Sequence, residues 1–207
     1  MIDLNEAFAR RSLTEFCKLL YDRKLTVSAG GNMSVRLNGD EFLITPSGVN
    51  KGLLNPENLI KMDLTGRVLG HGKPSIEHRF HLELYKANPA VGAIVHCHPL
   101  YCLALSVRGE PLRTCLTPEG VLLLGKVPTV RYETPGSEEL VQAVLEHAAS
   151  PAMLMAQHGA LTQGKNLEEA YDRMEELEFQ AHLQLLAGRD APELPAAEIA
   201  KLEAMRG

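Results

Sequence analysis

The chain has 207 residues, of which 45% are apolar and 23% are charged, and its formal net charge is −5. These proportions are those of a globular domain and exclude a disordered chain or a coiled coil as a description of the whole sequence. The apolar runs, such as 121–124, are too short to span a bilayer, and no block of lysine and arginine indicates nucleic-acid binding. Four cysteines without C-x-x-C spacing predict free thiols and a cytoplasmic protein: Cys17, Cys97, Cys102 and Cys115.

The first third of the chain predicts one helix followed by two hairpins. In 3–24 the apolar residues recur at helical spacing, and they are Phe8, Leu13, Phe16, Leu19 and Leu20. A glycine-rich segment at 28–32 ends this helix. The first hairpin joins strands 33–37 and 41–45 through Asn38-Gly39-Asp40, and the second joins 60–64 and 67–69 through Thr65-Gly66.

Further along, helices and short strands are interspersed. Helices are predicted at 77–87, 100–107, 137–149, 168–187 and 198–205, and strands at 91–98, 129–132 and 152–156. Segment 113–131 is mixed before its final strand. Because hairpins accompany the helices, the pattern predicts an α/β sandwich with a mixed, mostly antiparallel sheet and not a doubly wound dinucleotide fold. We expect one domain over 1–187 and a C-terminal tail with a short helix over 188–207.

Two of the eight histidines lie at the end of a predicted apolar strand. Side chains alternate along a strand, so His96 and His98 project from one face while Cys97 points to the other. Two neighbouring imidazoles suit a divalent metal, which neutral ring nitrogens bind at about 2.0–2.1 Å in the case of zinc. The alternative is a pair of solvated polar residues at a strand end.

A third histidine and an acidic residue complete a candidate site. Gln157-His158-Gly159 follows the buried strand 152–156, and Gly159 permits a close backbone approach beside His158. Three histidines would leave a coordination position open, as in catalytic zinc sites, whereas the alternative for His158 is a hydrogen-bonded turn residue. Glu77 opens a predicted helix, where it is either a proton-transfer group or an acid favoured by the helix dipole.

Five segments in this order resemble the class II aldolase/adducin family over about residues 5–187. Segments 30–36 and 43–48 resemble its two phosphate loops, and 74–81 resembles the stretch that carries its catalytic glutamate. His96-x-His98 and Gln157-His158-Gly159 resemble its metal ligands. The family implies a three-layer α/β/α sandwich. The closest resemblance within it is to the fuculose-phosphate aldolases.

The resemblance also implies the chemistry and the roles of the residues. His96, His98 and His158 would bind Zn²⁺, with Mn²⁺ or Co²⁺ as alternatives because imidazole serves them all. Glu77 would be the acid/base residue, and the substrate phosphate would be held by Asn32, Ser47, Gly48 and Ser75. The implied enzyme is a homotetrameric lyase with sites between subunits. It would cleave a short ketose 1-phosphate to dihydroxyacetone phosphate and an aldehyde.

The sequence departs from the fuculose-phosphate pattern in two places. Ile76 stands where those enzymes carry a second serine before the glutamate, and their loop and tail tyrosines have no clear counterpart. A metal-dependent decarboxylase, dehydratase or epimerase of a sugar phosphate is therefore the alternative within the family. An adducin-like interaction domain is the alternative outside enzymes, although it would have no need of three histidines and Glu77.

Overall fold

The chain forms one seven-stranded sheet in the computed structural model, which describes residues 4–37 and 40–206. The strand order is β3-β2-β1-β4-β7-β6-β5. The strands are β1 Asn32–Arg36, β2 Glu41–Ile44, β3 Ile60–Asp63, β4 Ala93–Cys97, β5 Thr129–Val130, β6 Ala152–Met155 and β7 Gly159–Gly164. Neighbouring strands pair antiparallel, except β5 and β6, which pair parallel. The predicted mixed, mostly antiparallel sheet is confirmed.

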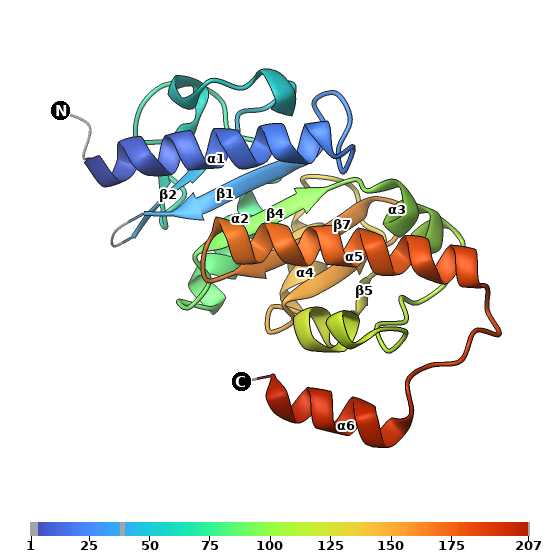
Figure 1. Ribbon diagram of the computed structural model, residues 1–207. Helices are drawn as coiled ribbons and strands as arrows, with labels where there is room; N and C mark the ends of the chain where they lie inside the picture. The colour runs from blue at the N-terminus through green and yellow to red at the C-terminus, as the bar shows by residue number, and fades with distance from the viewer. Residues whose placement is uncertain (1–3, 38–39, 207) are drawn as a thin grey trace.

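Helices cover both faces of this sheet. The helices are α1 Leu4–Asp22, α2 His78–Ala87, α3 Leu100–Val107, α4 Glu138–Leu145, α5 Leu167–Ala187 and α6 Ala196–Met205. In Figure 1, α1 and α5 lie in front of the sheet while α2 and α4 lie behind it. Each face has its own apolar core, one shared with α1, α3 and α5 and the other with α2 and α4. The three-layer α/β/α arrangement is therefore confirmed.

Strand β4 is central and carries the alternation that positions the site. Ala93, Val95 and Cys97 are buried in the core shared with α1, α3 and α5, and Ile94 is buried in the opposite core. His96 follows the same alternation and lies on the α2 side, next to Phe80 of α2 at a ring-centroid distance of 5.7 Å. Cys97 packs as a small apolar residue on the face that the sequence predicted.

The structure corrects the sequence prediction in three places. Strand β7 was not predicted, because Gly159-Ala-Leu-Thr-Gln-Gly164 lacks the β-branched and aromatic enrichment typical of strands. Phe8 and Leu19 are exposed, and Cys17 is buried in their place between Leu13 and Leu20. Helix α4 ends at Leu145, four residues before the predicted end at residue 149. The turn residues Asn38 and Gly39 of the first predicted hairpin lie outside the described residues.

The predicted second hairpin is confirmed with a short second arm. Met62 of β3 forms an isolated bridge to Val68, and the Leu69 N–H donates to the Lys61 carbonyl at 2.8 Å. Segment 113–131, ambiguous in sequence, contains the π-helix η3 (Gly120–Leu124) before β5. Helix α6 contacts η3 at the lower edge of the molecule in Figure 1. Among the described residues, no helix has the length and apolar character needed to cross a membrane.

Candidate metal centre

Three histidines from two chain segments meet at one end of the central strands. His96 is the fourth residue of β4, His98 follows the strand, and His158 lies in the turn between β6 and β7. Their ligating nitrogens all lie within 4.8 Å of one another. The turn is tight because Met155 pairs with Gly159, and Gln157 adopts a left-handed conformation with φ of 50°. The convergence predicted from the sequence is thus present in the structure.

The ring nitrogens suit a divalent metal. His96 Nδ1 lies 2.9 Å from the Ala160 carbonyl, to which it donates, so His96 Nε2 keeps a free lone pair. His96 Nε2, His98 Nε2 and His158 Nδ1 are buried without a hydrogen-bond partner among the described residues. Burial, together with the neighbouring imidazoles, lowers the pKa of His98 to about 3 and that of His158 to about 4. Neutral imidazoles with free lone pairs are the form that binds metal.

Glu77 is the acidic group of the centre. It occupies the N-cap position of α2 and is 6% exposed. Its two carboxylate oxygens lie 3.3 Å from His96 Nε2 and 3.3 Å from His158 Nε2 respectively. Burial opposes its ionisation, but the two imidazoles and the amide of Asn32 outweigh this and lower the pKa of Glu77 to about 2. Glu77 is therefore an ionised carboxylate beside two of the three histidine rings.

A cavity of about 320 Å³ opens beside this cluster. Of the eight residues singled out from the sequence, all but His96 line this cavity: Asn32, Ser47, Gly48, Ser75, Glu77, His98 and His158. Asn32 pairs with His96 across β1 and β4, which fixes the loop before β1 next to the metal ligands. The Ser47 N–H is already donated to the Lys73 carbonyl, and the Ser75 hydroxyl accepts from the Glu77 N–H at 3.3 Å. Ile76 lines the same cavity and is 53% exposed.

Two buried residues that were not predicted as part of the site, Lys51 and His81, form hydrogen bonds with the segments that line the cavity. Lys51 is 3% exposed, and its Nζ donates to the carbonyls of Ala29 and Val49 at 3.0 Å each. It thereby ties together the two loops that line the cavity. His81 is fully buried, and its Nε2 lies 2.5 Å from Asn32 Oδ1. His81 could have been placed near Glu77 from the sequence, because a spacing of four residues brings both to one side of a helix.

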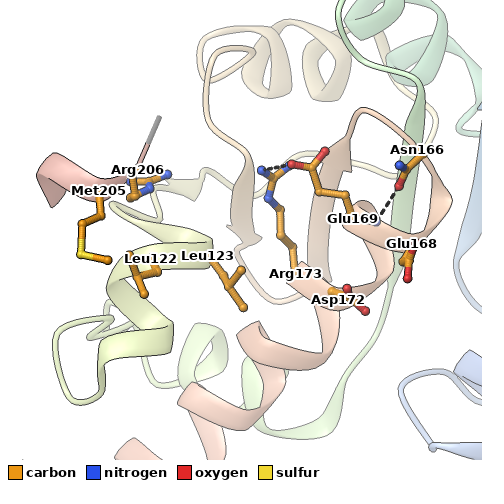
Figure 2. Close-up of a pocket in the computed structure, with 9 residues that line it drawn as sticks. All are labelled: Leu122, Leu123, Asn166, Glu168, Glu169, Asp172, Arg173, Met205 and Arg206. Carbon is orange, nitrogen blue, oxygen red and sulfur yellow. Dashed lines mark hydrogen bonds and ion pairs between the residues drawn. The ribbon is translucent and has the colours of Figure 1, made fainter. Parts of the chain in front are cut away.

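A larger cavity of about 500 Å³ lies elsewhere, between η3, the start of α5 and the end of α6. Figure 2 shows that Arg173 and Glu169 point toward each other. Arg173 pairs with Glu169 at 2.7 Å, and Asn166 accepts from the Glu169 N–H. No histidine is among the residues that line it. The smaller cavity is the one that combines a metal-ligand cluster with an ionised carboxylate.

Comparison with known proteins gives a family match over most of the chain. A model described as the class II aldolase and adducin N-terminal domain matches residues 11–185. The L-fuculose phosphate aldolase of Methanococcus maripaludis is 39% identical over 177 residues, which cover 84% of this chain and 96% of that protein.

Two further matches extend over more of this chain. The 3-oxo-tetronate 4-phosphate decarboxylase of Haemophilus influenzae is 38% identical over 197 residues, which cover 92% of this chain and 94% of that protein. The crystal structure of YgbL from Escherichia coli, an aldolase/epimerase/decarboxylase candidate, superposes with a TM-score of 0.91 at 36% identity. The superposition covers 96% of this chain and 99% of that one.

Proposed function

Because the chain belongs to the class II aldolase and adducin family, we propose that it is a metal-dependent lyase of a small sugar phosphate. The observation that carries this proposal is the cluster itself. One ring nitrogen from each of three imidazoles lies within 4.8 Å of the others, and a buried ionised carboxylate lies 3.3 Å from two of the rings. A divalent metal bound there, zinc first and manganese or cobalt as alternatives, would supply positive charge to stabilise an enediolate.

The chain's own residues then bind the substrate and move one proton. We assign the phosphate to the end of the cavity formed by Ser47, Gly48 and Ser75, where hydroxyls and a left-handed glycine are available. The Asn32 side chain lines the same cavity, but one of its amide hydrogens is donated to Glu77 Oε2 at 2.8 Å. Glu77 Oε1 has no hydrogen-bond partner among the described residues, so we propose that the proton moves at this oxygen.

Two reactions lead to the same enediolate. In a ketose 1-phosphate, breaking the C3–C4 bond releases an aldehyde and leaves the enediolate of dihydroxyacetone phosphate. In a 3-oxo-tetronate 4-phosphate, breaking the C1–C2 bond releases carbon dioxide, and the bonding electrons form the same enediolate. Protonation of its carbon gives dihydroxyacetone phosphate in both cases. One site with one proton-transfer group at the enediolate carbon can therefore serve either substrate.

We favour decarboxylation over aldol cleavage. Decarboxylation takes up a single proton from water, which Glu77 can deliver, whereas aldol cleavage also removes a proton from the hydroxyl of the departing aldehyde. Glu77 is the one carboxylate among the described residues that line the cavity. The Haemophilus decarboxylase also matches a larger share of this chain than the Methanococcus aldolase does. Aldol cleavage of a fuculose-1-phosphate-like ketose is the second candidate, supported by the 39% identity to that aldolase.

The experiment measures dihydroxyacetone phosphate with a coupled NADH assay on 3-oxo-tetronate 4-phosphate and on L-fuculose 1-phosphate. The enzyme is stripped of metal and reloaded with zinc, manganese or cobalt. Trapped carbon dioxide identifies decarboxylation, and a carbonyl reagent identifies the aldehyde. Activity on neither substrate together with less than about one tenth of an equivalent of bound metal would refute the lyase proposal and favour an interaction domain. Glu77→Gln keeps the size of the side chain and removes its acid/base function. Full activity in Glu77→Gln would show that Glu77 is not the proton-transfer group.

Assembly and compartment are further parts of the proposal. The family resemblance supports a homotetramer with sites at subunit interfaces, and light scattering that gives the mass of one chain would contradict it. All four cysteines are free thiols, which fits a reducing compartment such as the cytoplasm.

A further inference from the structure

A line of buried polar side chains runs away from Glu77 into the core between the sheet and α2. Asn32 Nδ2 donates to Glu77 Oε2 at 2.8 Å, and Asn32 Oδ1 lies 2.5 Å from His81 Nε2. His81 Nδ1 lies 2.7 Å from the Ser34 hydroxyl, which lies 2.8 Å from the Tyr85 hydroxyl. None of these four side chains is more than 3% exposed. The line therefore ends inside the protein and not in solvent.

The donor at each link follows from the orientation of the Asn32 amide, whose Nδ2 faces Glu77 Oε2 and whose Oδ1 faces His81 Nε2. An amide oxygen only accepts hydrogen bonds. His81 must then carry its proton on Nε2, and its Nδ1 accepts from the Ser34 hydroxyl. Ser34 in turn accepts from the Tyr85 hydroxyl. All four hydrogen bonds run in one direction, toward Glu77.

We propose that His81, Ser34 and Tyr85 are positioning residues, which hold the Asn32 amide with its NH₂ toward Glu77 and thereby fix the catalytic carboxylate. This inference rests on the proposed function of Glu77 as the proton-transfer group. Without the Nε2–H of His81, the Asn32 amide is free to turn its carbonyl toward the carboxylate. Two acceptors would then face each other, and Glu77 would leave its position between His96 and His158.

Packing alone does not explain these polar residues. Tyr85 belongs to the apolar core shared with α2 and α4, and its neighbours include Phe42 at a ring-centroid distance of 5.3 Å. Apolar side chains of similar volume would fill this core without any polar group to satisfy. A fully connected polar line in such a place instead specifies one arrangement of its members. The residue whose orientation is fixed by this line and that contacts Glu77 is Asn32.

Two substitutions of His81 provide the sharpest test. His81→Gln places an amide NH₂ near the former Nε2 and keeps the donor to Asn32, whereas His81→Asn keeps only a group near the former Nδ1. We expect His81→Asn to lower kcat about 10- to 100-fold with KM changed by less than about threefold, and His81→Gln to recover most of the loss. Ser34→Ala and Tyr85→Phe should lower kcat by successively smaller factors, because they lie further from Glu77.

A control variant and a spectroscopic measurement separate positioning from stability. Thr162→Val removes a fully buried hydroxyl that donates to the Ala170 carbonyl at 2.7 Å and has no link to Glu77. It should lower the unfolding midpoint to the same extent as Ser34→Ala while leaving kcat unchanged. Equal kcat in His81→Asn and wild type, or an equal loss in Thr162→Val, would overturn the proposal.

Nitrogen NMR of the histidine rings reports the His81 tautomer without any enzyme assay. We expect the Nε2–H form in the wild type and an increased Nδ1–H fraction in Ser34→Ala. An Nδ1–H form in the wild type would reverse the line of donors and overturn the proposal, whatever substrate the enzyme uses. Absence of lyase activity with the expected tautomer would instead refute the proposed function and leave the directed line intact.

Discussion

Alanine substitutions at two glycines that line the cavity separate backbone conformation from close packing. Gly31 and Gly48 both have left-handed backbones, with φ of 69° and 73°. An added Cβ at Gly48 meets nothing within 4 Å, whereas at Gly31 it would lie 2.5 Å from the His96 carbonyl oxygen and 2.9 Å from Cys97 Cα. Gly48→Ala therefore introduces only the left-handed strain, about 1–2 kcal/mol. Gly31→Ala adds a collision with backbone atoms.

The size of that addition follows from what Gly31 touches. Strand β4 is paired on both sides, with β1 and with β7, so it cannot shift away without breaking ladder hydrogen bonds. Overpacking in such a place adds about 1–3 kcal/mol, and we expect Gly31→Ala to lose about 2–5 kcal/mol in total. Because the displaced residues include His96, metal content should fall as well.

Urea unfolding of the two variants measures the difference, and metal analysis of the same samples reports the site. We expect a lower midpoint for Gly31→Ala than for Gly48→Ala, with an unchanged slope, and a metal deficit in Gly31→Ala alone. Equal midpoints, or full metal occupancy in Gly31→Ala, would show that the loop before β1 can yield without moving β4, and the reasoning from close approach would be wrong.

Two further predictions concern the metal and the loops. Zinc at about 100 times its dissociation constant should stabilise the apo-protein by about 2.7 kcal/mol in thermal unfolding. His98→Ala should abolish this stabilisation. His71→Ala is the control, and it should keep the stabilisation because His71 is exposed. Lys51→Met should lower stability by about 2 kcal/mol, because two hydrogen bonds from a charged donor are lost while the desolvation of the buried ammonium is relieved. Lys51→Met should also raise KM more than it lowers kcat, because Lys51 joins the two loops that line the cavity. An unchanged KM would show that these loops hold their positions without Lys51.

The histidine cluster was predictable from the sequence because it depends on local periodicity. His96 and His98 share a face through strand alternation, and His158 lies in the turn that follows a buried strand. Glu77 at the start of α2 follows from the same local signals. The role of His81 was not predictable, because a histidine on a helix face looks the same in sequence whether its ring contacts solvent or the Asn32 amide.

Strand β7 could not be predicted for a related reason. Thr162 and Gln163 are polar, yet both are buried, since Thr162 donates to the Ala170 carbonyl and the Gln163 amide donates to the carbonyls of Ala148 and Ser150. These acceptors belong to other elements, so their positions exist only in the folded chain. Gly164 is likewise required by a contact that exists only in the folded chain, because a Cβ there would lie 2.6 Å from the Ala170 nitrogen of α5.

The charge of the centre connects its parts. The chain is acidic overall, and the pKa values of His98 and His158 keep both rings neutral near pH 7, while Glu77 is ionised. Without a metal, Glu77 would repel a phosphorylated substrate from the cavity that it lines. A divalent ion bound by the three histidines would reverse the sign of the centre, and the buried ammonium of Lys51 adds positive charge behind the two loops. Neutral ligands are therefore the suitable set, since a carboxylate or thiolate in place of one histidine would cancel the positive charge that the anionic substrate requires.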